Sequence, residues 1–226
     1  GVLAREVPVL QQALSVLAPS GEPMQAPASV RWCAWLPTER LDATTASSLQ
    51  AWCQARGAQP IDLDAVVADL SIHAQRVLCH EVGQTHREAL LNGSADPAVQ
   101  ALGWSGLAMP PDWYTASMAV RGTWLDRFVS LVFGQADVLV LPALPHGVPD
   151  WDVVQVGEPR FDARELLALH QFMGFINYLG LPALHLPIGR DARGRPIGLQ
   201  WVARPFAEPL LLALAEQQAS FFSQNI

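Results

Sequence analysis

NYLGLPALHLPIGRDARGRPIGLQWVARPFAEPLLLALAEQ, residues 177–217, is the most strongly patterned stretch of the chain. A helix end at a glycine, followed by proline and a short apolar run, predicts a strand over residues 184–187 that a second proline closes. The polar segment 190–196 contains a glycine and predicts a turn, and residues 197–203 predict a returning strand, so the two strands form a hairpin. A final amphipathic helix is predicted over residues 207–222.

The remainder of the chain alternates helical and extended patterns in the same way. Such alternation predicts an α/β layered fold, with the run 137–141 as a strand buried on both faces. The other predicted strands cover residues 30–36 and 61–63, and the predicted helices cover residues 8–17, 41–56, 64–91 (one long helix or an interrupted one), 111–133 and 165–178.

Composition excludes several classes of function. The 226 residues are 50% hydrophobic and 15% charged, which predicts a large core, and the net charge of −7 argues against a nucleic-acid surface. All fourteen basic residues are arginine, so this chain supplies no lysine for a Schiff base, a phosphate-binding loop or a Ser-Lys hydrolase. Small molecules or other proteins are the expected partners.

Cysteine usage predicts a cytoplasmic protein, and the hydropathy pattern predicts that no segment spans a membrane. The three cysteines, Cys33, Cys53 and Cys79, form no C-x-x-C motif and are predicted to be free buried thiols. The uncharged stretch 166–189 is long enough for a span, but its polar residues and prolines favour a buried helix followed by a buried strand.

Two apparent catalytic patterns are rejected. His80 and His86 are about 240° apart on a helix and do not share a face, while His73 and His80 share one but lack a third ligand, so no metal site is predicted. Ser105 lies in a G-W-S-G segment that lacks the second glycine position of a nucleophile elbow, and its flanks are predicted to be loop.

The ordered motifs of residues 177–217 resemble the closing segment of amidase-signature enzymes. An asparagine, G-L-P, P-x-G and P-x-G-x-Q follow in that order before a strand and a last helix. The run 137–145 resembles the family's strand and proline loop, Tyr114 and Arg121 have its Y-to-R spacing, and residues 1–19 resemble the helix that follows its catalytic loop. The motif residues so matched are Asn177, Gly180, Pro182, Pro187, Gly189, Gly198 and Gln200.

The resemblance implies a mixed β-sheet flanked by helices and hydrolysis of a carboxamide C–N bond without metal or organic cofactor. Family members use a serine nucleophile, a second serine in a cis peptide and a lysine, with a glycine-rich loop that binds the oxyanion. This chain contains no such loop and no lysine, so no catalytic residue is assigned to it. Residues 1–226 are therefore expected to be the C-terminal portion of one amidase domain, an incomplete fold that is inactive without the N-terminal half.

By position, the resemblance places Tyr114, His146, His170 and Met173 at the substrate pocket. A histidine at position 170, where amidases acting on amino-acid amides often carry an acid, and the neutral segment 102–104 favour a less polar amide. The net charge argues against a nucleic-acid partner, and the polar residues and prolines of 166–189 argue against a membrane. Self-association into a homo-oligomer stays open.

Several of the residues named above also have a structural interpretation, and for His146 and His170 packing and a place in the pocket are equally open. Asn177 and Gln200 are predicted to be amides in apolar surroundings that bind backbone groups, and His185 is predicted to be a core histidine. Arg121 is predicted to form a salt bridge, and the eight tryptophans are predicted to be core or interface residues.

Two other functions fit the same sequence. A degenerate paralogue could serve as a non-catalytic binding module, and this interpretation predicts that the isolated chain is folded and monodisperse. An A-type subunit of a glutamine-dependent amidotransferase would need partner proteins. The fragment interpretation predicts exposed sheet edges and apolar faces.

Overall fold

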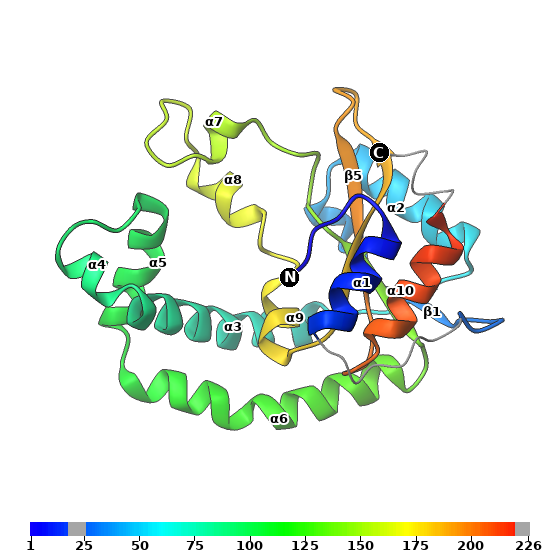
Figure 1. Cartoon of the computed structure of the whole chain (residues 1–226), viewed down its shortest axis with the longest axis horizontal. Helices are drawn as coiled ribbons and strands as arrows, with labels where there is room; N and C mark the ends of the chain where they lie inside the picture. Colours follow the sequence, from blue (N-terminus) through cyan, green and yellow to red (C-terminus); the bar gives the residue numbers. More distant parts are fainter. Residues whose placement is uncertain (18–25, 220–226) are drawn as a thin grey trace. The chain divides into compact units, whose positions relative to one another are not determined.

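The computed structural model describes residues 1–17 and 26–219, which form two compact units (Figure 1). Unit 1 contains residues 1–62, 129–148 and the part of the chain from Gly180 onward, and unit 2 contains residues 63–128 and 149–179. Each unit is described by itself.

A five-stranded mixed sheet forms the centre of unit 1, as the sequence predicted. Its order is β2-β1-β3-β5-β4, with β1 parallel to β2 and β3, and with β5 antiparallel to both β3 and β4. The strands are β1 (Trp32–Ala34), β2 (Gln59–Pro60), β3 (Val138–Pro142), β4 (Ala183–Arg190) and β5 (Pro196–Val202). Every residue of β3 is buried, which confirms the prediction for this strand.

One face of the sheet carries the hydrophobic core of unit 1. Because strand side chains alternate between faces, Trp32 and Trp201 point to the same side, where they meet Trp52 of α2 (Ala43–Ala55). The three ring centroids lie 5.1–5.8 Å apart. Helix α10 (Glu208–Gln217) covers the same face, so these tryptophans are core residues as predicted.

Helix α1 (Val7–Leu17) lies beside α10 (Figure 1). Gln11 donates a hydrogen bond of 2.8 Å to the carboxylate of Glu216. Helix α1 agrees with its prediction, and α10 agrees over residues 208–217. The predicted end of the last helix, beyond residue 219, lies outside the described residues.

The hairpin of β4 and β5 has the predicted antiparallel pairing, with a register shift between Pro187 and Gly189. Pro187 is tolerated because β4 is an edge of the described sheet, where a missing N–H donor can face outward. Before the hairpin, Gly180 has a φ of 72°, and this left-handed conformation ends the preceding helix. Residues other than glycine rarely adopt it.

Unit 2 is built from helices. They are α3 (Asp64–Thr85), α4 (Arg87–Leu91), α5 (Pro97–Ala108), the greater part of α6 (Pro111–Phe133), α7 (Trp151–Val154), α8 (Ala163–Ala168) and α9 (Gly174–Leu179). None of the helices in the described part of the chain combines the length and the hydrophobicity that a membrane span requires.

Helices α3 and α5 approach closely because glycines line their contact. A Cβ atom at Gly106 would lie 1.8 Å from the carbonyl oxygen of Cys79, and one at Gly83 would lie 2.9 Å from the carbonyl oxygen of Gly103. Only hydrogen in place of the side chain allows the two backbones to lie this near to one another.

Three predicted elements differ from the structure. The segment around Ser105 is helix α5 rather than loop, because Asp96 caps it by accepting from the Ala98 N–H at 2.8 Å and Pro97 occupies the first turn. The predicted helix 165–178 is split into α8 and α9 by tight turns, including the Met173 N–H donating to the His170 carbonyl.

Strand β2 ends before the predicted range 61–63. The pattern did not fix this boundary because short apolar runs do not distinguish a strand from the loop beside it. The helix predicted over 64–91, as one long helix or an interrupted one, is interrupted at His86, in agreement with the second alternative. A further helix, η1 (Thr38–Arg40), is a 3₁₀ turn between β1 and α2.

We expect Gly106→Ala to destabilise the protein by at least about 1–3 kcal/mol, because the new methyl group forces the α3 and α5 backbones apart. Gly122→Ala is the matched control, since a Cβ there meets nothing within 4 Å. That helical substitution should stabilise by roughly 0.5–1 kcal/mol. Urea unfolding of both variants measures the difference, and equal effects would contradict the close helix contact.

Candidate functional site

A proline-rich loop follows β3, and we call residues 141–148 the proline loop. Its first part is fixed to β5: the Ala143 N–H donates to the Gly198 carbonyl at 3.2 Å, and the Gln200 side-chain amide donates to the Pro142 carbonyl at 3.0 Å. Gln200 is only 1% exposed, so its predicted role as a buried amide that binds backbone is confirmed.

Asp42 fixes the middle of the proline loop. Its own N–H donates to the Pro145 carbonyl at 2.9 Å, and its carboxylate accepts from the Gly147 N–H at 3.2 Å. The same carboxylate caps α2 by accepting from the N–H and the hydroxyl of Thr45. Burial opposes ionisation of Asp42, but these hydrogen bonds outweigh it and lower its pKa.

Two arginines of the β4–β5 turn hold the end of the proline loop. Arg193 and Arg195 both donate to the Val148 carbonyl, at 2.8 and 2.6 Å. Asp191 orients this turn by accepting from the N–H groups of both arginines, and these bonds lower its pKa. The proline loop is thus held at its beginning, middle and end.

His146 therefore lies on a loop with little freedom. Its side chain is half-buried, and Nδ1 lies 2.8 Å from the carbonyl oxygen of Gly147. In the neutral tautomer in which Nδ1 donates to that carbonyl, Nε2 is an acceptor.

His185 lies opposite Gln200 in the β4–β5 register. The residue keeps an exposed surface on the edge strand, so the prediction of a core histidine is wrong. Its ring still approaches the Gln200 amide closely enough for a hydrogen bond. Desolvation of the imidazole lowers the pKa of His185 despite that bond.

In unit 2, Tyr114 of α6 is half-buried and stacks on His80 of α3. The ring centroids lie 4.1 Å apart and the planes are inclined by 18°. One turn earlier on α3, the Arg76 guanidinium lies over the Trp113 ring at 4.6 Å from its centroid. Tyr114 is thus placed by an aromatic contact that sequence reasoning did not anticipate.

Arg121 contacts the end of a helix and has no carboxylate partner within residues 1–17 and 26–219, so the predicted salt bridge is wrong. Its guanidinium donates to the carbonyls of Tyr178 and Leu179, the last two residues of α9, at 2.5 and 3.3 Å. Cationic groups are favoured at helix C-termini because the last carbonyls have no partner within the helix. The Y-to-R spacing therefore joins α6 to the segment that leads to Gly180.

A buried polar contact supports the same junction. The fully buried Ser117 lies 3.1 Å from Nδ1 of His73, and the Tyr178 hydroxyl donates to the Ser117 carbonyl. His73 also stacks on Tyr178, with ring centroids 5.7 Å apart. Desolvation, aided by the charge of Arg76, lowers the pKa of His73.

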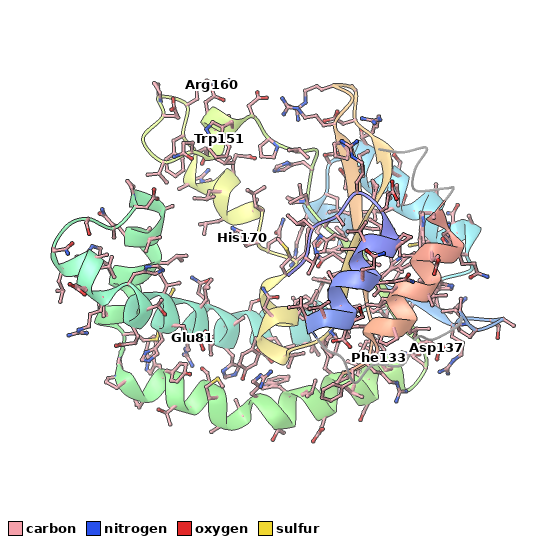
Figure 2. All side chains as sticks on the ribbon, in the orientation of Figure 1. Glu81, Phe133, Asp137, Trp151, Arg160 and His170 are labelled. Carbon is pink, nitrogen blue, oxygen red and sulfur yellow. The ribbon has the colours of Figure 1, made fainter. Side chains whose placement is uncertain are left out.

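The other expected pocket residues lie near the junction of α8 and α9. His170, labelled in Figure 2, follows the end of α8 and is exposed. Met173 is half-buried in the turn before α9. Asn177 is exposed on α9, so its predicted apolar surroundings are wrong. The short α9 buries Phe175, Ile176 and Tyr178 on its other sides.

The remaining motif residues lie in unit 1. Pro182 precedes β4 and is buried, and its carbonyl accepts from the Ala203 N–H. Gly189 ends the register shift in β4, and Gly198 lies where a Cβ would be 3.2 Å from the Cβ of Ala143. Hence Gly198 leaves room for the proline loop.

The three cysteines are free and buried, as predicted. Burial raises the pKa of Cys33 to about 12 and that of Cys53 to about 11, so both are thiols rather than reactive thiolates at neutral pH. Within the described part of the chain, no three His, Cys, Asp or Glu side chains gather as metal ligands.

The structure thus distributes the expected pocket residues over both units. His146 is in unit 1, while Tyr114, His170 and Met173 are in unit 2. Sequence reasoning missed Asp42, His80 and Arg195. For Asp42 a signal was present, because an aspartate before a helix is a common cap, but nothing in the sequence identifies its second bond to the proline loop.

We expect Asp42→Ala to cost about 1–2 kcal/mol of stability through loss of the α2 cap, and to free the Gly147 N–H as well. Asp96→Ala removes only a cap, on α5, and is the matched control. Amide hydrogen exchange at Gly147 should quicken in the first variant alone. Unchanged exchange there would refute the role of Asp42 in the proline loop.

The free energy of unfolding should fall as the pH is lowered below about 6.5, the pKa of an unperturbed histidine. His73 and His185 both have lowered pKa values in the folded state, so the unfolded state binds protons first and is favoured by acid. Replacing His73 with Gln should reduce this pH dependence, and replacing both histidines should reduce it further. An unchanged slope in the double variant, measured by urea unfolding, would contradict this.

Sequence comparison gives one family for most of the chain. The family model described as Amidase matches residues 42–212. A fatty acid amide hydrolase of Medicago truncatula is 33% identical over 102 residues, which are 45% of this chain and 17% of that protein. The A-type subunit of the mitochondrial glutamyl-tRNA(Gln) amidotransferase of Ornithorhynchus anatinus is 31% identical over 114 residues, 49% of this chain and 21% of that protein.

Solved structures have the same fold. An amidase crystal structure superposes with a TM-score of 0.79 at 21% identity, over 97% of this chain and 52% of that one. The structure of a vestigial protein complex, related to the origins of an s-triazine catabolic enzyme, superposes with a TM-score of 0.72 at 21% identity. The superposition covers 96% of this chain and 46% of that one. The chain thus spans about half the length of these structures, and its family match covers both the proline loop and the hairpin: it belongs to the amidase family.

Proposed function

We propose that this chain is the C-terminal part of an amidase that hydrolyses a carboxamide C–N bond. The serine nucleophile, the cis-peptide serine and the lysine would lie upstream of Gly1. The amidase family match over residues 42–212 carries this proposal. It is supported by the absence of lysine from the chain and by the chain's spanning 52% of the amidase with the same fold.

In this proposal, the chain supplies a wall of the substrate pocket rather than its reactive groups. Tyr114, His146, His170 and Met173 would contact the amide. The three-point attachment of the proline loop supports such a role for His146, because a pocket wall is most effective when it needs no reorganisation on binding.

The proposed substrate is a carboxamide of low polarity. The neutral segment 102–104 and a histidine rather than an acid at position 170 support this choice. Several relatives are named fatty acid amide hydrolases, from Medicago truncatula, Arabidopsis thaliana and rice. The free thiols of all three cysteines support a cytoplasmic location.

A second function is supported by similarity to amidotransferases. Relatives that are named as A-type subunits of glutamyl-tRNA(Gln) amidotransferase are 31–34% identical, and one structure of the same fold belongs to a protein complex. On this alternative, the chain belongs to a protein that functions together with partner proteins. A non-catalytic paralogue that only binds partners is the third alternative, and homo-oligomers are compatible with all of them.

The complete protein, as its gene encodes it, should hydrolyse neutral aliphatic or aryl amides, whereas residues 1–226 alone should not. Replacing the upstream nucleophilic serine with alanine should lower kcat by about 10³-fold or more. Ammonia release from a panel of neutral, acidic and amino-acid amides measures both effects.

Three outcomes would redirect the proposal. A start codon directly before Gly1, with no glycine-serine loop upstream, would refute the fragment and favour the binding paralogue. Activity that requires co-purified partner proteins and glutamine would favour the amidotransferase alternative. Preference for charged amino-acid amides would refute the proposed substrate class while leaving the amidase intact.

A further inference from the structure

Both tyrosines of the sequence stack on histidines from one face of α3. Tyr114 stacks on His80 and Tyr178 stacks on His73. His73 and His80 are seven residues apart, almost two helical turns, so they project from the same side of the helix. The two tyrosines come from different elements, α6 and α9, and α3 thus orients both through the same kind of contact.

The His80–Tyr114 pair is the tighter of the two. Its centroid separation is 4.1 Å, compared with 5.7 Å for His73 and Tyr178. At 4.1 Å and 18°, one face of the Tyr114 ring is covered by the imidazole, and a ligand can reach only the other face, the edge or the hydroxyl. The ring of a tyrosine has two side-chain torsions, and this stack restrains both.

The backbone of α3 at His80 is held in place by its contact with α5. A Cβ at Gly106 of α5 would lie 1.8 Å from the carbonyl oxygen of Cys79 and 3.0 Å from the His80 nitrogen, so α5 rests on the α3 backbone at this residue. Arg76 lies one helical turn before His80 on α3, and its guanidinium covers the ring of Trp113, the residue before Tyr114. The start of α6 therefore meets α3 through two adjacent ring contacts.

We propose that His80 is a positioning residue for Tyr114, holding the phenol ring in the orientation in which it meets the non-reacting part of the amide substrate. This inference rests on the proposed function, in which Tyr114 contacts the substrate. His80 acts through Tyr114 and takes no part in bond cleavage. Its loss should therefore weaken substrate binding without slowing the chemical step.

The stack can be tested without any activity. The complete protein is labelled with 3-fluorotyrosine, and the resonances of Tyr114 and Tyr178 are assigned with Tyr114→Phe and Tyr178→Phe. We expect His80→Ala to shift and broaden the Tyr114 resonance alone, and the matched variant His73→Ala to affect the Tyr178 resonance alone. An unmoved Tyr114 resonance in His80→Ala would overturn the inference at its first step.

Kinetics then test the functional part on a neutral aryl amide, benzamide. His80→Ala should raise KM by about two- to tenfold, the range of an aromatic pair, with kcat unchanged. His80→Phe restores a stacking ring and should restore KM, whereas a residue needed only as a titrating group would not be rescued. His73→Ala should leave KM near that of the parent protein.

The outcomes separate this inference from the proposed function. Hydrolysis with a normal KM in both His80→Ala and Tyr114→Ala would overturn the inference and leave the amidase standing. A complete protein that hydrolyses no amide would overturn the proposed function. In that event, addition of benzamide still decides the inference, because binding beside Tyr114 must shift its fluorine resonance and must weaken in His80→Ala, and the absence of either effect overturns it.

Discussion

The antiparallel pairing of β3 with β5 is the constraint on which unit 1 depends. This register sets Leu141 opposite Gln200, so the buried glutamine reaches the Pro142 carbonyl at the point where the strand becomes the proline loop. The same pairing sends Trp201 to the opposite face, into the tryptophan core. Because strand side chains alternate, a slip of one residue would exchange these two roles and bury the indole where the amide is needed. One register therefore positions both the core and the candidate site.

Beside that strand pair, hydrogen bonds restrain the backbone of the proline loop. Asp42 is both a helix cap and a loop ligand, and Arg193 and Arg195 share the Val148 carbonyl. A loop rich in proline offers few N–H donors, and its carbonyls must find donors elsewhere. Here the backbone N–H of Asp42, the side-chain amide of Gln200 and the guanidinium groups of the β4–β5 turn supply them. The result is a loop whose backbone is held on both sides of His146.

Unit 2 reaches rigidity by a different route. Glycines remove side chains from the α3–α5 contact, and the space saved brings the backbones together. On the other side of α3, aromatic rings and a guanidinium make the contact with α6, and Arg121 closes α9 from the same helix. These contacts hold the residues that the amidase resemblance places at the pocket, and they give the Y-to-R spacing a physical meaning: the tyrosine is stacked and the arginine is a cap.

The sequence by itself determined the elements with strong punctuation: the β4–β5 hairpin with its glycine and prolines, the buried strand β3, the long helix α6 and the family to which they belong. It failed in α5, where the flanks of Ser105 were predicted to be loop although this segment is a helix whose glycines pack against α3. It also could not place the expected pocket residues, or name Asp42, Arg195 and His80 as their supports. Only the tertiary structure decided these contacts. Asp42 and Gly147 are over a hundred positions apart, and His80 and Tyr114 are over thirty positions apart. Contacts at such separations depend on how the elements pack, and the periodicity of the sequence does not record that packing.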